Sequence, residues 1–278
     1  MNLLRFISED GKEDWMYAQP IRPIDDDYSS QTPGYGITRW SGLSDALAES
    51  DDYDTLFLFN GTYTGPISIQ QPITLQGEDK STTLIDGQGD GTVLSIETDG
   101  VTIKGLTFTN SGDLREDAGL LIQPPNIWTS QPILIEDCIF SDNQNGIYLT
   151  TKLPLFSADI FIEDNKVEHN QNGIFIKNSK SPLRISGNLI DNNEVGIFLK
   201  HVNKATIQNN DFIGNDRHCT IIDLQKSSFT ANYWDNWIGH RFNTSLPLPK
   251  IINGISGTRL RVFSQIKIDF NPSSQQFN

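Results

Sequence analysis

This chain of 278 residues contains only two cysteines, Cys138 and Cys219, and two methionines, Met1 and Met16. A small protein held together by disulfides needs many more cysteines, so that class is excluded. Basic residues are also few, since 21 Lys and Arg stand against 35 Asp and Glu, a net charge of −14. Sequence-independent nucleic-acid binding and docking on an anionic membrane both depend on clustered basic residues, so we expect neither.

Long hydrophobic runs are missing as well. No window approaches the roughly 18 apolar residues of a membrane helix, so we expect no membrane insertion. The N-terminus MNLLRFISEDGKEDW has an apolar stretch too short for an export signal. A chain whose leader had been removed would look the same, so the sequence leaves the compartment open. Aromatic residues make up 10% of the chain, which excludes a wholly disordered protein.

A repeat runs through the middle of the sequence in three columns that keep the same phase. One column is glycine, with steps of 27, 27 and 23 residues: Gly119, Gly146, Gly173 and Gly196. A second column is mostly asparagine: Cys138, Asn165, Asn188, Asn210 and Asn232. In a third column each asparagine precedes its glycine by three residues, except for the last, which precedes His218: Asn143, Asn170, Asn193 and Asn215. Such self-similarity indicates a repeat architecture.

Each repeat holds short runs of alternating apolar and polar residues, such as the Ile-Tyr-Leu that begins at Ile147. Alternation with a period of two predicts strands, and no stretch within a repeat is long enough for a helix. Strands that recur in phase must stack each unit on the previous one, about 4.8 Å away. Asparagine suits the tight bends, and its amide can bond to the copies above and below. We therefore predict an all-β parallel solenoid.

The residues that carry a family resemblance are GTYTGPISIQQPITLQGEDKSTTLIDG, the repeats, and the closing NYWDNWIG. They resemble the right-handed parallel β-helix proteins, in particular the NosD-like group of periplasmic copper-binding type, over roughly residues 40–240. The resemblance implies a single right-handed parallel β-helix, an extracellular, cell-surface or periplasmic setting, and an association with polysaccharide. We expect no copper site, because Cys, Met and His do not gather in the sequence.

The predicted organisation has three parts. Residues 1–37 are polar and broken by prolines, which indicates an arm or linker. Residues 38–239 form the β-helix, and within them residues 41–50 have helical spacing, with Ser41 as a candidate N-cap. This short helix would cover the open strand edges of the first coil. Residues 240–278 lose the repeat and are read as a C-terminal cap and tail.

Two pairs of carboxylates occupy the same phase of consecutive coils: Glu136-Asp137 and Glu163-Asp164. Stacking should bring Glu136 within about 5 Å of Glu163. Three readings stay open. The carboxylates could hold Ca²⁺, they could act with Arg184 as an acid/base pair on a sugar, or they could be solvated charges partly offset by Arg184 and Lys166. The last reading is favoured, because screened surface carboxylates are common.

Aromatic residues form a second candidate site. Tyr148, Phe175 and Phe198 lie between inward-pointing apolar residues of successive strands, so we expect them to point outward as a stripe. Such a row could stack on sugar faces, or an arm, a tail or a second subunit could cover it. Two longer coils should place Trp128 and Phe156 on a wall beside the carboxylates. Asn60-Gly61-Thr62 and Asn243-Thr244-Ser245 match glycosylation acceptors, a motif that is frequent by chance.

The sequence is compatible with two candidate functions. The leading one is a non-catalytic protein that binds a polysaccharide or a protein partner. The alternative is a polysaccharide-active lyase, hydrolase or epimerase that uses the paired carboxylates. No catalytic motif of the β-helix enzymes matches, which favours the binding protein. We expect no cofactor, with Ca²⁺ as the one ion the carboxylates could hold, and the sequence does not decide the oligomeric state.

Overall fold

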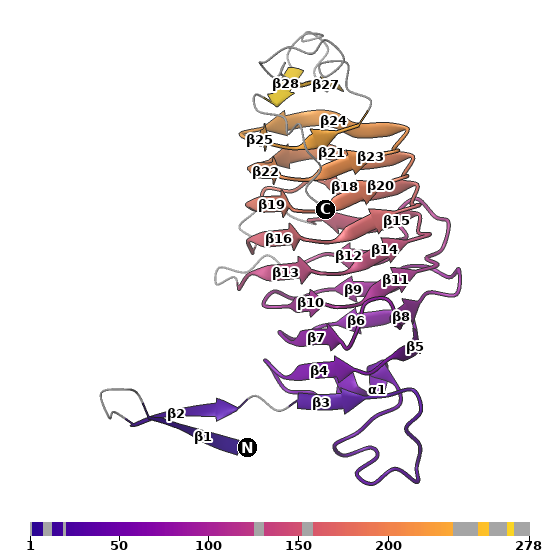
Figure 1. The fold of residues 1–278 in the computed structure, drawn as a ribbon, viewed down its shortest axis with the longest axis vertical. Helices are drawn as coiled ribbons and strands as arrows, with labels where there is room; N and C mark the ends of the chain where they lie inside the picture. Colours follow the sequence, from indigo (N-terminus) through magenta and orange to yellow (C-terminus); the bar gives the residue numbers. More distant parts are fainter. Residues whose placement is uncertain are drawn as a thin grey trace.

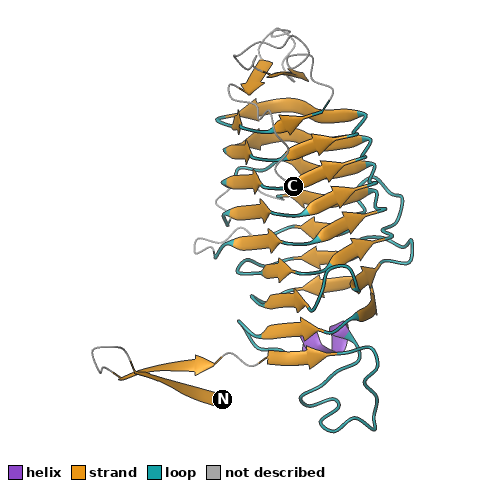
Figure 2. Ribbon diagram, viewed as in Figure 1, coloured by secondary structure: helices purple, strands orange, loops and turns teal. Residues whose placement is uncertain are grey.

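A computed structural model describes residues 21–124, 131–151 and 158–235, together with the backbone of four outlying strands. Those strands are β1 (Asn2–Ile7), β2 (Glu13–Ala18), β27 (Lys250–Ile255) and β28 (Ile266–Asp269). The chain winds as a right-handed parallel β-helix whose coils stack along the long axis (Figure 1). Figure 2 shows that strands and turns make up nearly all of the described chain, as predicted.

Three sheets form the sides of the solenoid, and each coil contributes about one strand to each. In spatial order, the first sheet contains β3 (Ile21–Ile24), β4 (Thr55–Leu58), β7 (Thr74–Gly77), β10 (Thr102–Lys104), β13 (Ile133–Glu136), β16 (Ile160–Glu163), β19 (Leu183–Ser186), β22 (Ala205–Gln208) and β25 (Ser228–Thr230). The second sheet contains β5 (Gly61–Thr64), β8 (Thr83–Asp86), β11 (Thr107–Thr109), β14 (Ile139–Ser141), β17 (Lys166–Glu168), β20 (Leu189–Asp191), β23 (Asp211–Ile213) and β26 (Tyr233–Trp234).

The third sheet contains β6 (Ile67–Ile69), β9 (Leu94–Ile96), β12 (Leu120–Ile122), β15 (Asn145–Thr150), β18 (Asn172–Lys177), β21 (Val195–Asn203), β24 (Arg217–Gln225), β27 and β28. Neighbouring strands are parallel except for the last pair, β27 and β28, which is antiparallel. Both of these strands fall within residues 240–278, the segment predicted as a cap and tail. Strand β27 pairs with β24, so this segment continues the third sheet.

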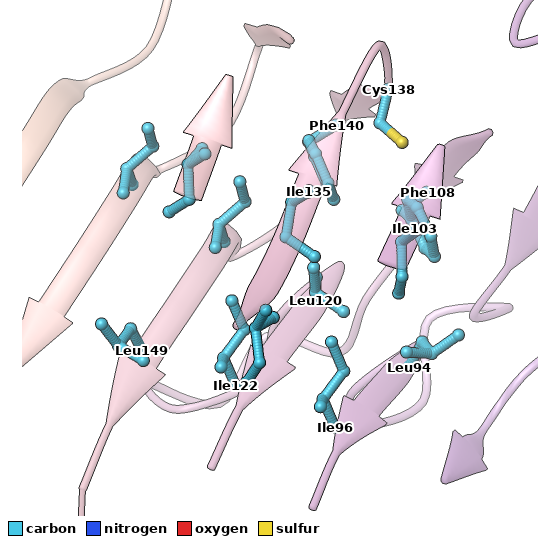
Figure 3. Packing of buried hydrophobic residues seen from close by; sticks show 14 of the residues in the cluster. Leu94, Ile96, Ile103, Phe108, Leu120, Ile122, Ile135, Cys138, Phe140 and Leu149 are labelled. Carbon is cyan, nitrogen blue, oxygen red and sulfur yellow. The ribbon is translucent and has the colours of Figure 1, made fainter. Parts of the chain in front are cut away.

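The core fills the inside of the solenoid with columns of like residues. In the first sheet one such column is fully buried and paired in register: Leu75, Ile103, Ile135, Ile162, Ile185 and Ile207. In the second sheet Phe108 stacks on Phe140 with ring centroids 5.1 Å apart. Figure 3 shows Ile103 and Ile135 beside these rings, in contact across adjacent coils. Burial of alternate side chains by stacking supplies the main driving force for the fold.

Two ladders of asparagine line the bends of the later coils. In one, the Nδ2 of Asn165 donates to Asn188 Oδ1 at 3.0 Å, and Asn188 donates likewise to Asn210 at 2.9 Å. In the other, Asn170 donates to Asn193 at 3.0 Å. Each amide also donates to a backbone carbonyl of the preceding coil, such as Ile135 O for Asn165. The predicted stacking of asparagines is confirmed, and it pairs polar backbone groups that would otherwise be buried alone.

The glycine column marks the closest approach of consecutive coils. A Cβ atom at Gly146 would lie 2.7 Å from the carbonyl oxygen of Gly173, and one at Gly173 would lie 2.6 Å from that of Gly196. No side chain fits at these distances. The column is therefore glycine for steric reasons, since these residues are not among those with a left-handed backbone.

The N-terminal end of the solenoid is covered by a helix, as predicted, but with a different start. Helix α1 (Leu43–Ala48) buries Leu43, Ala46 and Leu47 against the first coil. Its N-cap is Gly42, without a side-chain hydrogen bond, so the expectation of a Ser41 cap was wrong. Strand β3 already belongs to the first sheet, although it lies within residues 1–37. Ahead of it, β1 and β2 pair only with each other and extend away from the coils (Figure 1).

Candidate functional site

The predicted carboxylates lie together on the outer face of the first sheet. Glu136 and Glu163 end strands β13 and β16 and are paired in register, as expected from the repeat. The next residues, Asp137 and Asp164, have left-handed backbones with φ of 51° and 55° and turn the chain out of the sheet. Aspartate tolerates this conformation better than most residues because its short side chain can bond locally.

Glu163 is already engaged by neighbours on the following coil. The Arg184 Nε donates to its Oε1, and the Ser186 hydroxyl donates to the same oxygen at 3.1 Å. The Arg184 guanidinium also lies over the Phe161 ring, 4.9 Å from its centroid. Phe161 therefore supports the cation while Glu163 balances its charge, and these contacts hold Arg184 on the outer face.

Asp137 is engaged by a residue that lies two coils earlier. Lys80, from the turn between β7 and β8, places its Nζ 2.5 Å from Asp137 Oδ1. The carbonyl of Lys80 accepts a hydrogen bond of 2.5 Å from the Thr107 hydroxyl, which holds the turn against β11. The lysine side chain thus spans the coil that contains β10, and this span creates one wall of a pocket.

The pocket has a volume of about 430 Å³ and opens at the edge of the first sheet. Its lining comes from three successive coils and is dominated by charged and amide groups: Gln76, Gly77, Glu78, Asp79, Lys80, Lys104, Gly105, Glu136 and Asp137. Gly77 and Gly105 occupy the positions that Asp137 and Asp164 take in the next coils. A Cβ atom at Gly105 would lie only 2.9 Å from the carbonyl oxygen of Gly77, so the two coils approach too closely here for a side chain.

Lys104 lies at the centre of this pocket. In register it stands between Gln76 on one side and Glu136 on the other. Within residues 21–124, 131–151 and 158–235, neither the Lys104 ammonium nor the Glu136 carboxylate has an ion-pair partner. A free donor and a free acceptor therefore stand next to each other on the pocket wall, beside the Lys80–Asp137 pair.

Reasoning from the sequence found Glu136 and Asp137 but missed Gln76, Lys80 and Lys104. The early coils are irregular, with core residues Leu75, Ile103 and Ile135 separated by 28 and 32 residues, so they do not follow the later repeat. A usable signal was present nonetheless. Gln76-Gly77 and Lys104-Gly105 each pair a polar residue with a glycine at the end of a strand, in the phase of Glu136-Asp137.

The aromatic row has the predicted register and points away from the main core, as expected. Tyr148 stacks on Phe175 with centroids 5.0 Å apart, and Phe175 stacks on Phe198 at 4.9 Å. These rings lie outside the main core, in a separate cluster with Ala118 and Leu121. Tyr148 is only 1% exposed and Phe175 only 2%, so of the two readings left open by the sequence, these two rings follow the one in which another segment covers the row. Phe198 is half-buried, and ligand contact by the row stays a prediction.

A loop of residues 111–118 contributes to this burial. Tyr148 donates its hydroxyl to Glu116 at 3.3 Å, and Lys177 forms an ion pair with the same carboxylate at 2.9 Å. Asn145 holds the loop by donating to the carbonyls of Arg115 and Asp117. Burial raises the pKa of Tyr148 above its ordinary value, since the ionised phenol would lose its hydration. Trp128 and Phe156, the expected wall, lie outside the described residues.

A metal ion requires several ligand atoms close together. Acidic side chains converge at Asp25, Asp26 and Asp27, whose oxygens lie within 4.8 Å of one another. Two of these carboxylates already have structural partners. Asp25 accepts the backbone N–H of Asp27, and Asp26 accepts that of Thr62, which caps the edge strand β5. The predicted Ca²⁺ candidates are engaged differently, since Asp137 and Glu163 each pair with a cation.

Comparison with known proteins gives a family for this architecture. Residues 73–212, about half of the chain, match the family described as the right-handed beta helix region. The chain belongs to this family. No curated protein sequence matches this β-helix protein. No helix in the described part of the chain is long and apolar enough to cross a membrane.

Solved structures similar to this β-helix protein include carbohydrate-active enzymes. The pectin methylesterase PemA from Erwinia chrysanthemi aligns with a TM-score of 0.50 at 11% identity, over 78% of this chain and 71% of that one. A pectin methylesterase in complex with a hexasaccharide aligns with a TM-score of 0.53 at 8% identity, over 89% and 96%.

A lacto-N-biosidase from Eubacterium ramulus aligns with a TM-score of 0.52 at 11% identity, over 77% of this chain and 55% of that one. This β-helix protein therefore spans only about half the length of that enzyme. Identities this low show a shared fold and do not transfer an activity.

Proposed function

We propose that this β-helix protein binds a neutral polysaccharide on the outer face of its first sheet, without catalysis. The observation that carries the proposal is the pocket around Lys104 and Glu136. Its volume of about 430 Å³ lies within the range of about 300–1,000 Å³ that is usual for ligand sites. Its free ammonium and carboxylate groups stand side by side on two adjacent strands.

The chemistry of the pocket suits sugar hydroxyl groups. A hydroxyl both donates and accepts hydrogen bonds, so it needs partners of both kinds. Lys104 donates, Glu78 and Glu136 accept, and the Gln76 amide does both. Four carboxylates against two lysines give the lining a net negative charge, and the whole chain carries −14. A polyanionic glycan would be repelled by this field, which favours a neutral one.

The face continues beyond the pocket along the solenoid. One polar residue per coil occupies the same outward column, about 4.8 Å from the next: Gln76, Lys104, Glu136, Glu163, Ser186 and Gln208. Beside this column, the half-buried Leu134 and Phe161 offer apolar surface. An extended glycan with alternating polar edges and apolar faces would find matching partners along such a surface.

An enzyme of the glycosidase type is the weaker alternative. That chemistry requires one carboxyl group kept protonated, usually by apolar surroundings or by a second carboxylate without a counter-charge. Here Glu163 pairs with Arg184, Asp137 pairs with Lys80, and Glu136 adjoins Lys104. The cations favour binding and charge balance over proton transfer.

We further propose that the protein acts outside the cytoplasm, as the NosD-type resemblance implies, and that it needs no Ca²⁺. Support for a glycan ligand also comes from the similar fold that was solved with a hexasaccharide. At 8% identity that likeness says only that a parallel β-helix can hold an oligosaccharide.

Affinity electrophoresis of the full chain through immobilised glycans tests the proposal. Gels would contain neutral glycans such as xylan, mannan or β-glucan, or acidic ones such as pectin and alginate, with and without EDTA. We expect retardation by a neutral glycan that EDTA does not alter. Lys104→Met and Glu136→Gln should each weaken binding about tenfold, because each removes a hydrogen bond to a charged group. Lys200→Met, on the third sheet, makes the same change of charge as Lys104→Met and is the control for that variant.

Each other outcome has a clear meaning. Equal retention of the Lys104→Met variant and the wild type would show that the ligand does not bind in this pocket. Retardation only by pectin or alginate would contradict the neutral specificity. Release of reducing ends or of new unsaturated products, abolished in a Glu136→Gln/Glu163→Gln double variant, would establish the enzyme instead.

A further inference from the structure

The glycosylation motif Asn60-Gly61-Thr62 lies on an accessible turn of the first complete coil. The turn joins β4 to β5 (Figure 1), and both Asn60 and Thr62 are exposed. A match to such a motif is frequent by chance, and an acceptor must lie at the surface to carry a glycan. In this one, the acceptor asparagine and the threonine that defines the motif both reach solvent.

The hydrogen bonds of Asn60 leave the reacting atom available. Its backbone N–H donates to Glu78 Oε2 at 3.0 Å, and its Oδ1 accepts from the Thr82 hydroxyl at 2.6 Å. In the described part of the chain, its Nδ2 has no hydrogen-bond partner. The carboxamide is thus held through its oxygen, on a residue that is exposed as a whole. Compare Asn188, whose Nδ2 is buried and donates to three acceptors.

We propose that Asn60 is a site of N-glycosylation. The glycan is attached when the chain crosses a membrane that carries a lipid-linked oligosaccharide. In this reaction the Asn60 Nδ2 attacks the anomeric carbon of the first sugar. A C–N bond forms, the bond from that carbon to the lipid diphosphate breaks, and Nδ2 loses one proton. The lipid diphosphate leaves with the electron pair of the broken bond and takes up that proton, so nothing is oxidised or reduced. The transferase and the lipid-linked donor come from the exporting cell.

The site is independent of the proposed glycan-binding function but adjoins it. Glu78 both accepts the Asn60 N–H and lines the pocket. A glycan on Asn60 would therefore stand at the rim of that pocket. It would also shield β5, which is the N-terminal edge strand of the second sheet.

Peptide mass spectrometry of the full chain from the cells that naturally make it tests the proposal. Trypsin yields a fragment of residues 40–80, in which Asn60 is the only asparagine. Release of the glycan by an amidase in ¹⁸O-water converts that residue to labelled aspartate. We expect the label in this fragment, and a fragment mass before release that exceeds the sequence mass by the mass of a glycan. The fragment of residues 242–250 reports separately on Asn243.

Matched variants give the control. Thr62→Ser keeps the motif and should stay modified, whereas Thr62→Ala removes it and should leave the fragment bare. Both should fold, because Thr62 is exposed and uses its backbone N–H, at 3.0 Å, to contact Asp26. A wild-type fragment with the plain sequence mass and unlabelled Asn60 in all molecules would overturn the proposal, whatever the glycan-binding gels show.

Discussion

At the scale of single residues, asparagine is the side chain that the bends of the later coils require. Asn188 accepts both the backbone N–H and the Nδ2 of Asn165, and it donates to Ile162 O and Asn210 Oδ1. Among uncharged side chains, only the amides of Asn and Gln offer two N–H donors and a carbonyl acceptor at one site. Cys138, the one non-asparagine in this column, donates its backbone N–H to Asn165 Oδ1 but has no amide to continue the ladder, and its thiol donates to Glu136 O at 3.2 Å.

Replacement of Asn188 by alanine should therefore be costly. The change leaves a buried carbonyl and a buried N–H without partners, at about 1–3 kcal/mol each. We expect the free energy of unfolding, measured by urea denaturation, to fall by about 3–5 kcal/mol. Gln144→Ala removes the amide contact with Gln171 at a partly exposed position and should cost less than about 0.5 kcal/mol. Equal losses in the two variants would contradict a special role for the ladder.

The residue scale is also where prediction from sequence worked best, and where it failed. Periodicity identified the asparagine ladder and the buried Ile135 and Ile162, because stacking forces one residue type to recur. Periodicity also showed that Tyr148 and Phe175 point away from the main core. It could not show that they are covered, because cover comes from segments such as residues 111–118 that do not follow the repeat.

At the scale of elements, the loop of residues 111–118 is anchored by buried residues at both ends and by an ion pair between them. Ser111 and Ala118 are buried, while the residues between them are largely exposed. Glu116 reaches across β15 to Lys177 on β18. The hydrogen bond from Lys177 lowers the pKa of Glu116 below its ordinary value of 4.5, and the same bond raises the pKa of Lys177. The loop is thus joined to two coils beyond its own.

This ion pair should give a pH-dependent contribution to stability. A lowered carboxyl pKa stabilises the fold above the unfolded value of 4.5, and the effect is lost as the pH falls through the folded-state pKa. Glu116→Gln should therefore reduce the free energy of unfolding at pH 7 by up to about 1 kcal/mol, because the pair is exposed. The difference should disappear in strong acid and in 1 M salt.

Urea denaturation at each condition measures this difference. Asp113→Asn removes the same charge from an exposed position in the loop that has no ion pair in the described part of the chain, so it is the matched control. A Glu116→Gln effect that persists in acid would show that packing of the loop, and not charge, is what the substitution disturbs.

The pocket is a feature of elements that the sequence could not fully predict. Its walls combine one late coil, which follows the repeat, with two early coils that do not. The distance in sequence from Lys80 to Asp137 is 57 residues, and only the stacking of irregular coils brings them into contact. Glu136 and Asp137 were predictable because they keep the phase of the repeat. The positions of Lys80 and Lys104 depend on the lengths of the turns in the early coils, which the repeat does not give.

At the scale of the whole molecule, each coil contacts mainly its two neighbours, so stability should be close to a sum over coils. The column Ile162, Ile185, Ile207 and Phe229 advances by 23, 22 and 22 residues, which makes the later coils nearly interchangeable. Overall architecture was therefore the easiest feature to predict from sequence, since one repeating unit determines it.

Removal of one whole coil tests this view. Deletion of residues 193–214 joins Asn192 to Asn215 and leaves both asparagine ladders in phase. We expect a folded protein with a single cooperative unfolding transition. The m-value, which is the slope of the free energy of unfolding against urea concentration, should fall by about a tenth, because less surface is exposed on unfolding.

Deletion of residues 193–203 provides the control, because it removes half a coil and breaks both ladders. That variant should lose the β-sheet circular dichroism signal or unfold without cooperativity. Similar behaviour of the two deletions would contradict coil-by-coil additivity.

The two ladders have a consequence for how such a chain can change over evolution. A gene duplication or loss of 22 or 23 codons within the later coils inserts or removes a unit whose amide partners are already in place above and below. The part of the molecule beyond Asn165 can therefore change length without new compensating mutations. The stretch around Gly77 and Gly105 has no such freedom, because its turns differ from one winding to the next. Inherited variation in length should therefore accumulate at one end of the rod and spare the end that holds the Lys104 pocket.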